Sequence, residues 1–161
     1  MAPAVSGQVA MLRNAYADAG IDPATASFVG AHGTGTQAGD PVELEALSTV
    51  HGPGRERRLL VGSHKTNIGH SEAAAGLIGL IKTVLCLRHR TVPGNLHLRN
   101  PNPAIPWEDL PVTLPAMATP LDDASLGGTL AICCPPNAPD SCAGCATCSI
   151  PASTCCSAQA W

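Results

Sequence analysis

The hydrophobic pattern before residue 121 predicts two strand–loop–helix units. A short apolar run, "SFVGA", leads into the glycine-rich "HGTGT", and a second run, "RLLVGS", leads into the polar "HKTNIGH". Short apolar runs that are bounded by glycine or charge are typical of buried strands. Helices are expected after each loop, from Asp40 to about Val50 and from about His70 to Leu87. Units of this kind build α/β proteins, whose sites lie at the carboxyl ends of the strands.

Further turn and capping residues set the expected helix boundaries. The first helix is predicted from Gln8 to Ala19, because apolar side chains repeat at helical spacing and Gly20 supplies a C-terminal stop. In "DPVE", Asp40 suits the N-cap of the next helix and Glu43 can complete a capping box. The proline-rich stretch "TVPGNLHLRNPNPAIP" is expected to be extended, and "LPVTLP" to form a last edge strand.

The helix predicted from His70 to Leu87 is apolar almost all the way round. Between Ala73 and Leu87 only Lys82 and Thr83 are polar. Such a helix is expected to be buried on most faces, in the middle layer of a layered α/β protein. Cys86 lies within it and is expected to be a small core residue.

The composition changes in the last part of the chain, which predicts a division into residues 1–121 and a tail of residues 122–161. Of 8 cysteines, only Cys86 lies before residue 133, and the tail shows neither helical nor strand periodicity. Cys142, Cys145 and Cys148 have a spacing that invites an iron–sulfur or zinc site, with Cys155 as a possible fourth zinc ligand. A disulfide-bonded tail is the other alternative, and a cytoplasmic setting disfavours it.

Charge and composition exclude several classes of function. The net charge is −3, charged residues make up 13% and aromatic residues 2% of the chain. These values predict neither a nucleic-acid surface nor a basic membrane patch. The N-terminal sequence lacks a signal peptide and no apolar run is long enough to span a bilayer, so a cytoplasmic protein is expected.

Two histidines stand at matching positions, one after each predicted strand. His32 lies in "AHGTGTQAGDP" and His70 in "KTNIGHSEAAAG". Together these motifs resemble the ketosynthase (β-ketoacyl synthase) domains of type I polyketide synthases, which carry both motifs in this order and at about this distance. The resemblance continues through "LIKTVLCLRHRTVPGNLHLRNPNPAIPWEDL" and covers roughly residues 1–121.

The resemblance implies a fold and an activity. The fold would be the C-terminal lobe of a thiolase-like α/β protein with α/β/α/β/α layers, and the complete domain would be a homodimer. The activity would be decarboxylative Claisen condensation of acyl and malonyl-type thioesters in polyketide or fatty acid chain extension. The partner would be an acyl carrier protein, which delivers its substrate on a phosphopantetheine arm, and no cofactor would be bound directly.

The resemblance also assigns roles to individual residues. His32 and His70 would be the catalytic histidines, Lys65 would tune the electrostatics of the site, and Thr34 and Thr36 would hydrogen-bond the phosphopantetheine arm. Two neutral imidazoles can donate hydrogen bonds to the enolate oxygen that forms on loss of carbon dioxide. A helix beginning at His70 and burial there would favour the neutral ring.

Alternatives remain for the supporting residues. Lys65 could be solvated, and Thr34 and Thr36 could satisfy their own backbone in a turn. Gly33, Gly35 and Gly69 are expected to take positive φ or to admit a close approach of substrate. The other four histidines match no motif and are read as surface or core residues: His51, His64, His89 and His97.

The family's nucleophilic cysteine belongs to a half of the domain that has no counterpart in these residues. We therefore expect no complete condensation from this chain alone. The rival hypothesis is a non-catalytic pseudo-ketosynthase that pairs with a complete ketosynthase. A glycine-rich segment of the family is also missing after Asp123, and codons for "ASLGGT" read one base later can encode Arg-Arg-Trp-Ala-Gly, which resembles the start of that segment. The tail is accordingly interpreted as a shifted reading frame.

Overall fold

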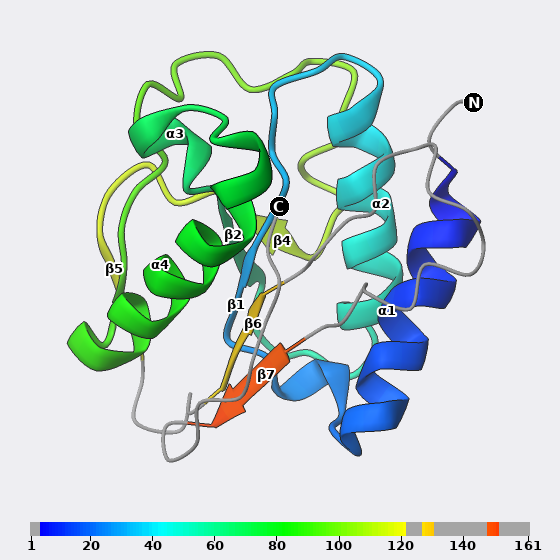
Figure 1. The fold of residues 1–161 in the computed structure, drawn as a ribbon. Helices are drawn as coiled ribbons and strands as arrows, with labels where there is room; N and C mark the ends of the chain where they lie inside the picture. Colours follow the sequence, from blue (N-terminus) through cyan, green and yellow to red (C-terminus); the bar gives the residue numbers. More distant parts are fainter. Residues whose placement is uncertain (1–3, 122–126, 131–147, 152–161) are drawn as a thin grey trace.

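The computed structural model describes residues 4–121, 127–130 and 148–151, the last two segments by their backbone alone. The chain forms a central sheet in the order β4-β2-β1-β6-β7, with helices on both faces (Figure 1). The strands are β1 (Phe28–Gly30), β2 (Leu59–Gly62), β4 (Val112–Thr113), β6 (Gly127–Leu130) and β7 (Cys148–Pro151). The first four of these run parallel, and β7 pairs antiparallel with β6. A second, two-stranded sheet joins β3 (Thr91–Val92) to β5 (Thr119–Pro120).

The helices α1 (Val5–Ala19) and α2 (Gly39–His51) cover one face of the sheet, and α4 (Ala75–His89) covers the other (Figure 1). Short helices fill the connections: a 3₁₀ turn at Pro23–Thr25, α3 at Lys65–Ile68 and a 3₁₀ turn at Glu72–Ala74. The three layers and the parallel strands confirm the α/β expectation.

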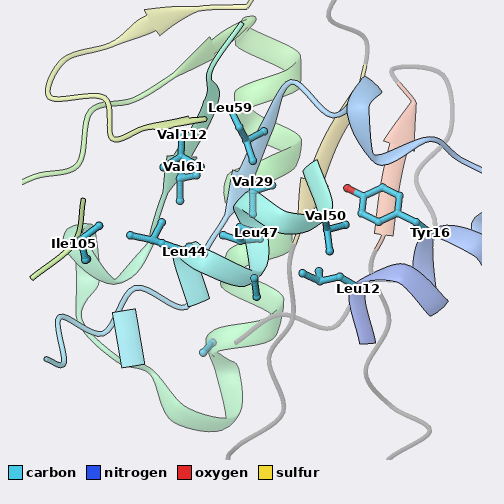
Figure 2. Close-up of a cluster of buried hydrophobic side chains, with 13 residues drawn as sticks. Leu12, Tyr16, Val29, Leu44, Leu47, Val50, Leu59, Val61, Ile105 and Val112 are labelled. Atoms are coloured by element: carbon cyan, nitrogen blue, oxygen red, sulfur yellow. The ribbon is translucent and has the colours of Figure 1, made fainter. Parts of the chain in front are cut away.

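The alternation of side chains along the strands creates two apolar clusters. Phe28 packs with Cys86 on the α4 face, whereas Val29 packs with Leu47 on the α2 face. Successive strand residues point to opposite faces, so a strand between two helical layers must be apolar throughout. The larger cluster lies between the sheet, α1 and α2 (Figure 2), and its largest members are Leu12, Tyr16, Val29, Leu44, Leu47, Val50, Leu59, Val61, Ile105 and Val112.

Most of the predicted elements are present with shifted ends. The first helix begins at Val5, and Gly20 ends it in the left-handed conformation (φ 64°), as the sequence predicts. The predicted edge strand is β4, which pairs with β2 at the border of the sheet. Short α3 is not anticipated by the sequence pattern.

The predicted start of α2 is wrong in its capping. The helix begins at Gly39, with Ala38 rather than Asp40 at the N-cap. The hydroxyl of Thr36 accepts the N–H of Gly39 at 3.1 Å and so satisfies one of the free donors of the first turn. Glu43 takes no part in a capping box, because its carboxylate bonds to the loop that follows β1.

The prediction for the helix after His70 needs two corrections. Regular α-helix begins at Ala75, after the 3₁₀ turn Glu72–Ala74, and not at His70. The helix is also buried on one face rather than on most of them. Its buried residues are mostly small, namely Ala75, Gly76, Gly79, Thr83 and Cys86, whereas Leu77, Ile81, Val84 and Leu85 are exposed. Small residues let the backbone of α4 lie close to the sheet, which turns the larger side chains outward.

The expectation of a tail without strands is wrong for two segments. Gly127–Leu130 pairs in parallel with β1, and Cys148–Pro151 pairs with Gly127–Leu130. The rest of the tail lies outside the described residues, together with Cys142, Cys145 and Cys155 and the metal, disulfide and reading-frame interpretations. The division of the chain at residues 121 and 122 stays a prediction.

Candidate functional site

The loops after β1 and β2 meet at one edge of the sheet. The two strands are neighbours in parallel register, with Gly30 opposite Gly62. The N–H of Ala31 donates to the carbonyl of Gly62 at 2.7 Å and extends this pairing by one residue. His32 and Ser63 therefore leave the sheet side by side, at the carboxyl ends of their strands, where open α/β sheets place their sites.

Side chains from three segments hold the backbone of His32. Its N–H donates to Oε1 of Glu43, on α2, at 2.6 Å. Its carbonyl oxygen accepts from Nζ of Lys65 at 2.9 Å and from Oγ of Ser63 at 3.2 Å. The backbone N–H and carbonyl of His32 are thus both satisfied by side chains rather than by the backbone hydrogen bonds of a strand or helix. These bonds fix the loop although it has no regular secondary structure.

The glycine after His32 is required by the closeness of the two loops. Gly33 has a φ of 49°, and a Cβ at this position would lie 2.9 Å from Cβ of Ser63. Its N–H donates to Oε2 of Glu43 at 3.0 Å. A side chain here would push the loops apart and strain the backbone. Gly35 and Gly69 also have positive φ, so the prediction is confirmed for all three glycines.

The rings of His32 and His70 lie against each other. Their centroids are 5.6 Å apart and their planes are nearly perpendicular, at 83°. The N–H of Glu72 donates to Nδ1 of His70 at 3.0 Å. Because a backbone N–H can only donate, Nδ1 must accept, and a neutral His70 ring carries its proton on Nε2. Two expectations for His70 are wrong. The residue is exposed rather than buried, and it does not begin the helix, which starts at Ala75. The N–H of Glu72 instead determines which nitrogen of the neutral ring carries the proton.

The environment keeps the imidazole of His32 neutral. Burial lowers the pKa of His32 to about 4, and the charges of Lys65, His70 and His64 act in the same direction. At pH 7 the ring is therefore uncharged and can donate a hydrogen bond from one nitrogen only. A neutral imidazole that lies against a second imidazole can contribute a hydrogen bond to a developing oxyanion.

The structure also places the supporting residues that the sequence indicates. Lys65 is directed at the backbone of His32 by the 2.9 Å bond from Nζ. The hydroxyl of Thr36 is engaged by the N–H of Gly39, as in the turn interpretation. Within the described residues, the hydroxyl of Thr34 has no hydrogen bond, and the residue is partly buried in the same loop.

Three residues around the site are not anticipated by the sequence pattern. The sequence pattern assigns Glu43 to a helix cap. An acidic residue on the side of a helix that is expected to face the sheet could have indicated a site residue instead. Ser63 reaches the carbonyl of His32, and His64 lies within the electrostatic surroundings of the His32 ring. The sequence left open whether His64 is a core or a surface histidine. It is only 5% exposed and is therefore a core histidine. Cys86 is also buried, which confirms its assignment to the core.

Two negative findings hold for the described part of the chain. Residues 4–121, 127–130 and 148–151 contain no cluster of three or more His, Cys, Asp or Glu side chains with the geometry to hold a metal ion. None of the helices described is long and apolar enough to cross a membrane.

Comparison with known proteins agrees with this geometry. Residues 1–99 match the model of the "Beta-ketoacyl synthase, C-terminal domain" family. The chain belongs to the β-ketoacyl synthase family. It is similar to a phenolphthiocerol/phthiocerol polyketide synthase of Mycobacterium tuberculosis, with 54% identity over 112 residues, which are 68% of this chain and 6% of that protein. It is also similar to polyketide synthase GfsA of Streptomyces halstedii, with 46% identity over 124 residues, which are 76% of this chain and 2% of that protein.

Solved ketosynthases share the fold. The ketosynthase from module 6 of the bacillaene synthase of Bacillus subtilis superposes with a TM-score of 0.72 at 38% identity, covering 80% of this chain and 24% of that one. The oxazolomycin ketosynthase domain OzmH KS8 of Streptomyces albus superposes with a TM-score of 0.73 at 32% identity, covering 81% of this chain and 36% of that one. The β-ketoacyl synthase member described here therefore has the thiolase-like α/β fold of ketosynthases and spans about a quarter to a third of their length.

Proposed function

We propose that the chain supplies the histidine-bearing part of a ketosynthase that catalyses decarboxylative Claisen condensation during polyketide or fatty acid chain extension. The observation that supports this proposal is the pair of rings of His32 and His70, 5.6 Å apart at the carboxyl ends of adjacent strands. A neutral His32 and an Nε2-protonated His70 are the forms that donate hydrogen bonds to an enolate oxygen.

The proposed chemistry proceeds in two steps. In the malonyl-type thioester, the bond between the α-carbon and the carboxylate breaks, carbon dioxide leaves, and the electron pair forms an enolate whose oxygen accepts hydrogen bonds from the two histidines. The enolate carbon then attacks the carbonyl of an acyl group held as a thioester on a cysteine of the other part of a ketosynthase. A carbon–carbon bond forms and the cysteine leaves as a thiolate. In this proposal the chain is part of an acyltransferase.

The remaining roles follow from the same site. Lys65 holds the carbonyl of His32, and its charge adds to burial, the largest cause, in lowering the pKa of the His32 ring, which supports a positioning and electrostatic role. Thr34 and Thr36 lie in the loop beside His32 and are proposed to bind the phosphopantetheine arm of an acyl carrier protein. The carrier protein and its thioesters are the proposed partners, a homodimer is the proposed state of the complete domain, and a cytoplasmic location stays a prediction.

A chimera tests the function. Residues 1–121 would replace the homologous segment of the bacillaene module 6 ketosynthase, and decarboxylation of malonyl carrier protein and condensation would be measured. His32→Ala and His70→Ala should each lower the decarboxylation rate by about 100- to 1,000-fold, the usual effect of losing an oxyanion donor. His89→Ala is the matched control, because His89 is an exposed histidine at the end of α4. Full activity of the double His32→Ala/His70→Ala chimera would contradict the proposal.

The alternative of a non-catalytic module has one observation in its favour. The outer face of α4 exposes Leu77, Ile81, Val84 and Leu85, and a cavity of about 430 Å³ lies beside it. Exposed apolar patches of this kind often mark contacts between proteins. An inactive chimera together with stable co-purification of the chain with a complete ketosynthase would favour this alternative.

A further inference from the structure

Glu43 is a buried acid that binds the backbone of the loop carrying His32. It lies in the second turn of α2, and only 6% of the residue is exposed. Its Oε1 accepts the N–H of His32 at 2.6 Å, and its Oε2 accepts the N–H of Gly33 at 3.0 Å. Each carboxylate oxygen is thus committed to one of two consecutive backbone donors.

This arrangement depends on the charge of the carboxyl group. An ionised carboxylate is an acceptor at both oxygens, whereas a protonated carboxyl group carries one O–H donor. Protonation would turn one oxygen into a hydroxyl and remove the negative charge, so the two charge-assisted hydrogen bonds to the backbone N–H groups would be weakened. The N–H groups of the consecutive residues His32 and Gly33 both donate to the same carboxylate, so the loop is held at two neighbouring points.

The position of the His32 ring follows from these bonds. The carbonyl side of His32 is held by Lys65 and Ser63, and its N–H side is held by Glu43. Loosening the N–H side would let the peptide turn about the carbonyl contacts and would carry the ring away from His70. A displacement of about 1 Å at a catalytic group is enough to slow a reaction by about 100-fold.

We propose that Glu43 is a positioning residue that aligns His32 against His70 only while its carboxylate is ionised, so that protonation of Glu43 releases the His32 loop. The importance of this alignment for catalysis rests on the proposed function, but the release itself does not.

Burial of Glu43, modified by its hydrogen bonds and neighbouring charges, places this switch near neutral pH. Burial raises the pKa of Glu43 to about 7, opposed by the N–H bonds from Gly33 and His32 and by the positive charge of Lys65, and supported by the negative charge of Asp40. Asp40 lies one turn earlier on α2, and burial raises its pKa as well. The His32 ring stays neutral over this range, because its pKa is lowered to about 4. The carboxylate is therefore present above about pH 7, and the loop is released as the pH falls below it.

Nuclear magnetic resonance on the full chain tests the proposal without any catalytic assay. The backbone amide signals of His32 and Gly33 would be followed from pH 5.5 to 9. They should shift together with a midpoint near 7, and Glu43→Gln should abolish this step because the amide cannot ionise. Glu45→Gln is the matched control: it removes the same charge from an exposed position of α2 and should leave the step unchanged. If Glu43→Gln does not fold, the titration of the wild-type chain still decides.

The proposal would be overturned if the amide signals of His32 and Gly33 did not shift with pH in the wild-type chain. It would also be overturned if they shifted equally in Glu43→Gln. In the ketosynthase chimera, Glu43→Gln should lower kcat for decarboxylation roughly 10- to 100-fold while leaving KM unchanged, and should remove the rise of kcat through pH 7. If His32→Ala leaves the chimera fully active while the amide signals titrate as expected, the proposed function fails and the Glu43 switch stands.

Discussion

At the scale of single residues, burial by itself does not distinguish a site histidine from a structural one. His32, His51 and His64 all have a pKa lowered to about 4, and burial is the largest cause for each. His51 is fully buried, accepts from the hydroxyl of Tyr16 at 3.0 Å and donates from Nδ1 to the carbonyl of Leu47 at 2.9 Å. Its Nε2 links α2 to α1 through Tyr16, and its Nδ1 bonds within α2. What sets His32 apart is a second imidazole against its ring.

The buried His51 makes stability depend on pH. Its folded pKa of about 4 lies below the ordinary value of 6.5, so its contribution is present above pH 6.5 and is lost as the pH falls toward 4. The free energy of unfolding should therefore fall by about 1 kcal/mol from this residue between pH 7.5 and 5.5, measured by denaturant titration.

The double variant Tyr16→Phe/His51→Leu isolates that contribution, because it removes both partners of the hydrogen bond together. Glu43 acts in the opposite direction, since its raised pKa makes the folded state less stable as the pH rises from 4.5 toward 7. Glu43 contributes equally in the wild type and the double variant. The difference between their slopes of unfolding free energy against pH therefore reports His51 alone. Equal slopes would show that His51 does not titrate on unfolding in this range.

At the scale of elements, the loop after β1 and the start of α2 form one unit. The hydroxyl of Thr36 caps the helix at Gly39, and the carboxylate of Glu43 bonds the loop from one turn further along. The same helix that packs Leu44 and Leu47 into the core thereby fixes the loop that carries His32. The site is positioned by an element whose own stability comes from the core.

The two threonines of this loop can be separated by substitution. Thr36→Ala should lower the free energy of unfolding by about 1 kcal/mol, because the N–H of Gly39 loses its side-chain acceptor. Thr34→Ala, the matched control, should have a smaller effect on stability. In the chimera, a higher KM for malonyl carrier protein in either variant would support phosphopantetheine binding. An unchanged stability of Thr36→Ala would contradict the capping role.

At the scale of the whole molecule, α4 has its small residues against the sheet and its large apolar residues outward. Leu77 is 61% exposed and Ile81 is 49% exposed. An inner helix of a layered protein needs cover on both sides, since apolar surface left in water contributes nothing to stability. In this chain the described residues cover one side of α4.

We therefore expect the isolated chain to be poorly stable as a monomer. Thermal unfolding followed by circular dichroism should be broad, with a low midpoint, and the chain should self-associate as its concentration rises. Ile81→Gln/Leu85→Gln should reduce self-association and change the midpoint little, because both residues are about half exposed, at 49% and 46%. A sharp transition of the monomer at high temperature would contradict this expectation.

The hydrophobic pattern was sufficient to place β1, β2 and the helices before and after them, because each strand is short, apolar and bounded by glycine or charge. It failed at helix starts. The start expected at His70 was wrong because the 3₁₀ turn Glu72–Ala74 intervenes, and hydrophobicity does not distinguish a 3₁₀ turn from the first turn of an α-helix. Asp40 was misplaced because a hydroxyl outside the helix, that of Thr36, supplies the cap.

The sequence alone determined the layered α/β class and the two histidine loops, since strand periodicity, glycine position and motif spacing are local properties of the chain. The tertiary structure decided the rest. That the rings of His32 and His70 face each other follows from the parallel pairing of β1 with β2. That Glu43 holds the His32 loop follows from the packing of α2 on the sheet. Contacts between segments far apart in sequence depend on register and packing direction, which no local pattern encodes.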